Sequence, residues 1–100
     1  MNNTQKIKEI VAKIDIEKIT GYLQEHSASK TLRQIIGYKK RALDSSDEKE
    51  IFRLSVRLAY NLDMIVNKAD YVKKEEEKKH WLELSQEIFM NIKEPKTIKS

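Results

Sequence analysis

The sequence predicts an all-α fold, and three observations support this prediction. Glycine and proline are rare, with two and one in 100 residues, whereas a β fold needs turn residues at short intervals. No segment alternates apolar and polar residues as a strand does, and apolar residues recur at helical spacing instead. The apolar fraction of 39% is enough for one core. We therefore expect an antiparallel up-down four-helix bundle in a single domain over residues 1–94, followed by a short flexible basic tail over residues 95–100.

The first helix is expected to break near Asp15. Its apolar positions follow one helical phase up to Ile14 and a second phase from Ile16 onward, and the aspartate between them is a good capping residue. A second short helix then continues to about His26. Gly21 lies inside that helix and weakens it by roughly 1 kcal/mol relative to alanine.

A connection separates this segment from the next helix, which Ser27 or Ser29 is expected to cap. Gly37 lies on the side of that helix opposite the apolar residues, where a glycine is tolerated. Residues 44–47 form the clearest turn of the chain. This turn offers two overlapping capping boxes, Ser45 with Glu48 and Asp47 with Glu50.

The longest apolar pattern of the chain follows this turn and continues to about Lys68. Its stripe consists of Ile51, Leu54, Leu58, Leu62, Ile65 and Ala69, widened by Phe52, Ala59 and Val66. A stripe broader than a coiled-coil seam is typical of a helix that packs on two sides. We therefore expect this segment to be the central helix of the bundle.

The last helix is expected to begin with Tyr71 and Val72, with Asp70 as its cap. It then crosses seven charged residues at 73–79 before an apolar face returns at Trp81. The first two turns of this helix should therefore be solvated or extend beyond the core. The tryptophan follows directly after the charged residues, so we expect it at the edge of the core.

No pattern in the chain indicates catalysis. There is no cysteine, which excludes disulfides and thiolate metal sites. Glu76 and His80 have the i, i+4 spacing of two metal ligands, but a solvated helix face explains them better, since His26 is the one other histidine. Ser55 and Ser85 lie near apolar faces, where a serine usually bonds the carbonyl four residues back. We expect no enzyme activity, metal, cofactor or small-molecule substrate.

Charge and hydropathy indicate a soluble cytoplasmic protein. The first residues do not form a secretory signal, and no window approaches the ~18 apolar residues of a membrane span. The net charge of +4 permits contact with nucleic acid or with the inner face of a membrane. Basic residues follow the outer faces of the two middle helices, at Lys30, Arg33, Lys40, Arg41, Lys49, Arg53 and Arg57. Solvated faces explain them best; the alternative function is a small nucleic-acid-associated or regulatory protein that uses these faces.

The chain shares several features with one known family. They are the helix at 32–43 with Tyr38-Lys39-Lys40, the capped turn at 44–47, the sequence Leu54-Ser55-Val56-Arg57-Leu58, and a helix at 81–92 that ends in a short tail. In these features the whole chain resembles the immunity proteins of class IIa (pediocin-like) bacteriocins. The resemblance implies a cytoplasmic four-helix bundle without catalytic activity that protects a bacterium from a bacteriocin.

The resemblance also implies a partner and a place for its recognition. Members of the family act on the complex of bacteriocin and membrane receptor, the mannose phosphotransferase permease. Apart from the resemblance, a weak homodimer of this chain is a further alternative. Their C-terminal halves tend to set which bacteriocin is resisted. By this resemblance the partner-binding residues are expected to be Tyr71, Lys73, Lys74, Trp81, Lys93, Lys96 and Lys99. Which bacteriocin is resisted does not follow from the sequence.

Overall fold

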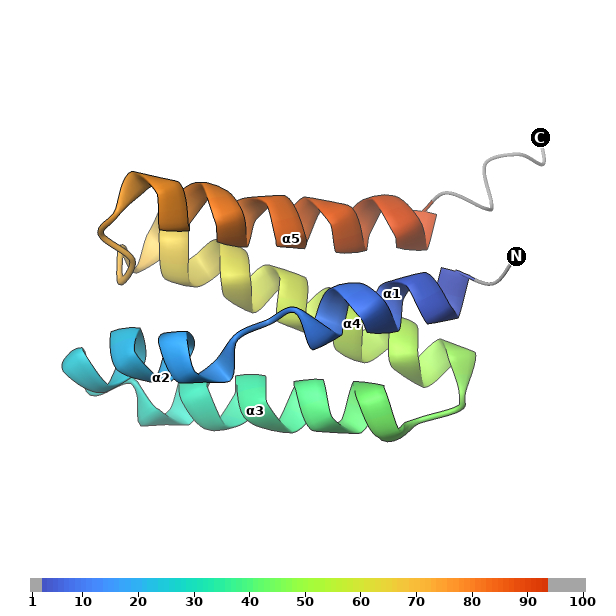
Figure 1. Ribbon diagram of the computed structural model, residues 1–100. Helices are drawn as coiled ribbons and strands as arrows, with labels where there is room; N and C mark the ends of the chain where they lie inside the picture. The colour runs from blue at the N-terminus through green and yellow to red at the C-terminus, as the bar shows by residue number, and fades with distance from the viewer. Residues whose placement is uncertain (1–2, 94–100) are drawn as a thin grey trace.

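A computed structural model describes residues 3–93 of the chain (Figure 1). Over this range every regular element is a helix and there is no strand, so the all-α prediction is confirmed. The elements are α1 (Asn3–Ala12), α2 (Ile16–Glu25), α3 (Ser29–Asp44), α4 (Glu48–Asp63), the π-helical turn η1 (Met64–Lys68) and α5 (Glu75–Lys93). The described residues thus hold five α-helices instead of the expected four. The predicted tail at 95–100 lies outside the described residues.

The fifth helix arises from the break near Asp15, which was predicted. The Asp15 carboxylate accepts hydrogen bonds from the backbone N–H groups of Glu17 (3.1 Å) and Lys18 (3.3 Å) and thereby caps α2. Ile14 is fully buried at the break. Its carbonyl, which the interrupted helix leaves free, accepts a hydrogen bond from the Lys39 ammonium of α3 at 2.7 Å. The backbone groups at the break are therefore satisfied by Asp15, which caps α2, and by Lys39 of α3.

Helix α4 lies at the centre of the molecule, as its broad apolar stripe predicted. It packs against α1, α3 and α5, whereas α3 and α5 do not pack against each other. Figure 1 shows α3 and α5 on opposite sides of α4, with α1 and α2 following one another along the chain in one direction. If α1 and α2 are counted as one segment, then α3, α4 and α5 each run antiparallel to the segment before them.

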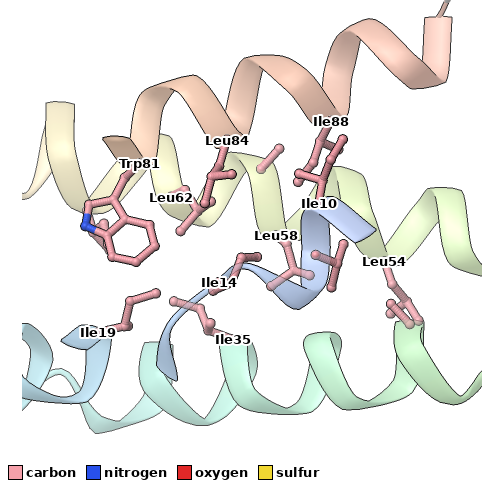
Figure 2. Close-up of a cluster of buried hydrophobic side chains, with 14 of the residues drawn as sticks. Ile10, Ile14, Ile19, Ile35, Leu54, Leu58, Leu62, Trp81, Leu84 and Ile88 are labelled. Carbon is pink, nitrogen blue, oxygen red and sulfur yellow. The ribbon is translucent and has the colours of Figure 1, made fainter. Parts of the chain in front are cut away.

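One core of isoleucine, leucine and tryptophan side chains joins all five helices (Figure 2). Side chains that are at most 2% exposed reach this core from each helix and from the break between α1 and α2: Ile10, Ile14, Ile19, Ile35, Leu58 and Trp81. The predicted stripe of α4 is buried from Ile51 through Ile65 and ends in a half-buried Ala69. Within residues 3–93 no helix combines the length and the apolar character needed to cross a bilayer.

The predicted cap of α3 by Ser27 or Ser29 is wrong. The N-cap residue is Ala28, which provides no side-chain bond. Ser27 instead adopts a left-handed backbone with φ of 55°. Its N–H donates to the carbonyl of Gln24, and the N–H of Ala28 donates to the carbonyl of Leu23. These two bonds form a Schellman motif, so Ser27 ends α2 and is not free to begin α3.

The turn at 44–47 is present, but its hydrogen bonds differ from the predicted boxes. Asp47 caps α4 by accepting from the N–H of Lys49 at 3.2 Å. Ser45 lies too far before the helix to act as a cap. Its hydroxyl accepts from the N–H of Asp47 (3.0 Å) and donates to Glu50 (2.9 Å). The Ser45 hydroxyl therefore bridges the N–H of Asp47 and the carboxylate of Glu50, which the predicted second capping box would join directly.

The predicted start of the last helix at Tyr71 is also wrong, because α5 begins at Glu75. Asp70 has a left-handed backbone with φ of 56° and does not cap the helix. Val72 is fully buried and anchors the connection in the core, and the carbonyl of Lys74 accepts the first helical hydrogen bonds. The charged residues at 73–79 are therefore divided between a non-helical connection and the first turns of α5.

Candidate functional site

A cleft of about 370 Å³ lies between the break of the first two helices and the start of α5. We call it the α2–α5 cleft. Its lining residues are Lys13, Asp15, Lys18, Tyr22, Glu76, Glu77, His80 and Trp81. Two segments that are far apart in the sequence, residues 13–22 and 76–81, therefore each supply four of the lining residues.

A continuous chain of hydrogen bonds crosses the cleft. The indole N–H of Trp81 donates to the hydroxyl of Tyr22 at 3.1 Å. That hydroxyl donates to one carboxylate oxygen of Glu77 at 2.9 Å. The ammonium of Lys18 donates to the other carboxylate oxygen at 3.1 Å. Both oxygens of Glu77 are thus engaged, and α2 is joined to the first turn of α5.

This network shifts the ionisation of its members. The hydrogen bond from Tyr22 is the main cause that lowers the pKa of Glu77, followed by the bond from Lys18. The hydrogen bond to Glu77 in turn raises the pKa of Lys18. Burial raises the pKa of the Tyr22 hydroxyl. Near neutral pH the site therefore holds a carboxylate, an ammonium and a neutral phenol in fixed positions.

Trp81 forms the inner wall of the cleft and is only 1% exposed, so it lies within the core instead of at its edge. Its indole ring meets the ring of Tyr22 edge to face, at 6.3 Å between centroids. The imidazole of His80 also meets the indole ring edge to face, with 4.7 Å between the ring centroids. A partner can reach His80 and the rim of the cleft, whereas the indole itself is covered.

The cleft does not assemble a recognisable catalytic group. Glu76 and His80 both line it, but no three His, Cys, Asp or Glu side chains between residues 3 and 93 are grouped as metal ligands. Its hydroxyl group, that of Tyr22, already donates to a carboxylate and has a raised pKa, which disfavours a nucleophilic phenolate. The arrangement is suited to holding two helices together and to presenting charged groups to a ligand.

The connection between η1 and α5 carries three of the predicted partner-binding residues. Tyr71 is half-buried and stacks on the imidazole of His26, with the ring centroids 4.5 Å apart. Lys73 is exposed and donates to the carbonyl of Asp70 at 3.1 Å. Lys74 is exposed as well. The structure thus brings Tyr71, Lys73 and Lys74 together on a tethered turn.

The other predicted partner-binding residues are not on this turn. Trp81 lies in the core beside the cleft. Lys96 and Lys99 lie outside the described residues, as does the side chain of Lys93.

The basic side chains that were predicted to follow the outer faces of the two middle helices are exposed, and several have partners. Arg41 is 3.7 Å from Glu50 and Lys40 is 3.8 Å from Asp44. The guanidinium of Arg57 lies 5.9 Å from the ring centroid of Tyr38. Four more basic residues of these helices are exposed and form no ion pair within residues 3–93: Lys30, Arg33, Lys49 and Arg53.

The two core serines differ from the prediction. Ser85 donates to the carbonyl of Ala59 on α4 at 3.0 Å, so it bonds across the helix interface and not within its own helix. The hydroxyl of Ser55 is fully buried and has no hydrogen-bond partner among residues 3–93. Close packing of α5 on α4 at small residues explains the first bond, because it brings a helix carbonyl within reach of the serine.

Sequence reasoning missed Lys18, Tyr22 and Glu77 as parts of one site. Lys18 and Glu77 are 59 positions apart, and each has a plausible local partner on its own helix. The position of Asp15 is the one available signal, since a capped break predicts irregular backbone where a cleft can form.

No protein-family model matches the chain, and searches of curated proteins and of solved structures return no match.

Proposed function

We propose that this chain is a non-catalytic immunity protein that protects a bacterium against a pediocin-like bacteriocin. It would do so from the cytoplasm, by contacting the complex of bacteriocin and mannose phosphotransferase permease. The resemblance in residues 32–58 and 81–92 supports this function. So does the helical arrangement: if α1 and α2 are taken as one broken helix, the described segments alternate in direction like a four-helix up-down bundle (Figure 1).

The observation that carries the proposal is the tethered turn at residues 70–74. Val72 is buried beneath it, and Tyr71 stacks on His26 of the neighbouring connection. Lys73 and Lys74 are held exposed above these two anchors. Because the backbone of this turn is already fixed, binding would cost little further backbone ordering, so a turn of this kind is well suited to recognising a partner.

The test is expression of the chain in a sensitive strain that is then challenged with a panel of pediocin-like peptides. We expect survival against at least one peptide. The double variant Lys73→Glu/Lys74→Glu should lose protection, since it reverses both positive charges of the turn. The matched control Lys6→Glu/Lys49→Glu makes the same charge change at exposed positions near the other end of the molecule and should protect normally.

Two outcomes would contradict this proposal. Unchanged killing by every peptide would argue against immunity itself. Equal loss of protection in both double variants would show that net charge matters and the turn does not. Immunoblotting of each variant confirms that the protein accumulates equally.

The alternative is a nucleic-acid-associated protein that uses the basic faces of α3 and α4. Four exposed basic residues that form no ion pair within residues 3–93 favour it: Lys30, Arg33, Lys49 and Arg53. Binding would depend steeply on salt, because phosphate contacts release counterions. Fluorescence anisotropy with duplex DNA at low and moderate salt tests this function, and absence of binding at low salt would exclude it.

A further inference from the structure

Two helices of the protein, α3 and α5, carry opposite net charges. Helix α3 carries five basic residues and one acidic residue, whereas α5 carries five acidic and three basic residues. The two helices lie on opposite sides of α4 (Figure 1). The molecule therefore has a basic side and an acidic side, and a negatively charged surface would orient it with α3 toward that surface.

The outward side of α3 also carries an apolar residue. Ile36 is 40% exposed, one of the three large hydrophobic side chains that stand out on the described surface. Arg33 precedes it by three positions and Lys40 follows it by four, so the three side chains share one side of the helix. Both cations are exposed. We call Arg33, Ile36 and Lys40 the α3 face.

The cations of this face are available to an external anion. Arg33 forms no ion pair among the described residues. Lys40 is 3.8 Å from Asp44, with both side chains more than 70% exposed, and such a solvated pair is weak. By contrast, Lys39 on the same helix is committed to the carbonyl of Ile14. An anion would therefore not have to displace a strong internal contact.

We propose that the α3 face docks on the surface of a bilayer that contains anionic lipids. Arg33 and Lys40 would lie over lipid phosphates, and Ile36 would enter the apolar boundary beneath the headgroups. Lipid is favoured over nucleic acid because a phosphate backbone gives an exposed isoleucine between two cations nothing to contact. The acidic α5 would then point away from the membrane. This inference does not depend on the proposed immunity function.

The experiment is sedimentation of the full chain with vesicles. One set contains equal parts of phosphatidylglycerol and phosphatidylcholine, and the other contains phosphatidylcholine alone. We expect binding to the anionic vesicles that weakens as salt is added, and no binding to the neutral ones. Neither bacteriocin nor receptor is present, so this result stands apart from the test of immunity.

Three variants locate the contact. Arg33→Gln/Lys40→Gln should bind anionic vesicles about thirtyfold more weakly, from the usual contribution of a basic residue near such a surface. The matched control Lys68→Gln/Lys79→Gln removes two exposed charges elsewhere and should bind within about threefold of the parent, because charges beyond a Debye length contribute little. Ile36→Gln keeps every charge and should bind about fivefold more weakly, since the isoleucine is only partly exposed.

Several results would overturn the inference. Equal binding to both vesicle types would show that the contact is not electrostatic. Equal losses of binding in the two double variants would show that the α3 face is not the contact site. Binding of duplex DNA without binding of vesicles, unchanged in Ile36→Gln, would assign the face to nucleic acid. Circular dichroism checks that each variant keeps its helix content, and the salt titration of the unaltered protein tests the electrostatic contact without any variant.

Discussion

The substitution Tyr22→Phe tests the hydrogen-bond network of the α2–α5 cleft. It removes one oxygen, which accepts from the indole of Trp81 and donates to Glu77. Trp81 is 1% exposed, so its N–H would be left buried without this acceptor. A buried donor that loses its partner costs about 1–3 kcal/mol. We expect the free energy of unfolding to fall by about that amount, and Tm by about 4–8 °C for each kcal/mol in a domain of this size.

The assay is guanidinium unfolding followed by fluorescence, which reports on the site directly because Trp81 is the single tryptophan. The matched control is Tyr60→Phe. Tyr60 is 61% exposed and packs edge to face on Phe89, a contact that phenylalanine retains. Its substitution should change the unfolding free energy by less than about 0.5 kcal/mol. Equal effects of the two substitutions would refute the argument, since the tyrosine hydroxyl of the cleft would then contribute nothing specific.

Three further predictions concern the helices and the cleft. Gly21→Ala and Gly37→Ala should each stabilise the protein by about 0.5–1 kcal/mol in thermal unfolding, because both glycines are helical and a Cβ there meets open space; a loss of stability in both would show hidden contacts. Ser55→Ala should stabilise by about 1 kcal/mol by removing an unpaired buried hydroxyl, whereas Ser85→Ala should be destabilising by about 1 kcal/mol, and the same sign for both would contradict their assigned bonding. The lowered pKa of Glu77 means that its stabilisation is present above its ordinary value of 4.5 and is lost as pH falls through the lowered value; the stability advantage over Glu77→Gln should therefore vanish in acid, and an advantage that persists there would exclude ionisation as its source.

Features that depend on neighbouring residues were predicted well from the sequence. The break at Asp15 follows from a change of apolar phase beside a capping residue, and the structure has that cap. The central position of α4 follows from the width of its stripe, whose residues from Ile51 to Ile65 are buried. In both cases the residues that carry the signal follow one another at helical spacing along a single segment, so the local pattern contains the information.

The ends of helices were predicted less well, because two uses compete for the same residue. Ser27 is a good N-cap by type, but the chain uses it in the left-handed position that ends α2. Asp70 is likewise a good cap that takes a left-handed backbone instead. The burial of Val72 fixes the connection in the core and delays the start of α5 to Glu75. That burial is a tertiary contact, which helix propensity does not include.

The α2–α5 cleft shows why the site was harder to predict than the fold. In the sequence, Glu77 is one of three glutamates in a run of seven charged residues, and each of the three could pair with a lysine three or four positions away. In the structure it is singled out because Tyr22 and Lys18 reach it from α2. The same contacts hold the first turn of α5, so they act on the turn at residues 70–74 from its C-terminal side while Tyr71 and Val72 hold it from within. Loss of the Tyr22 hydroxyl should therefore loosen the turn as well as the cleft, and partner binding that depends on a fixed turn should weaken even though no contacting lysine has changed.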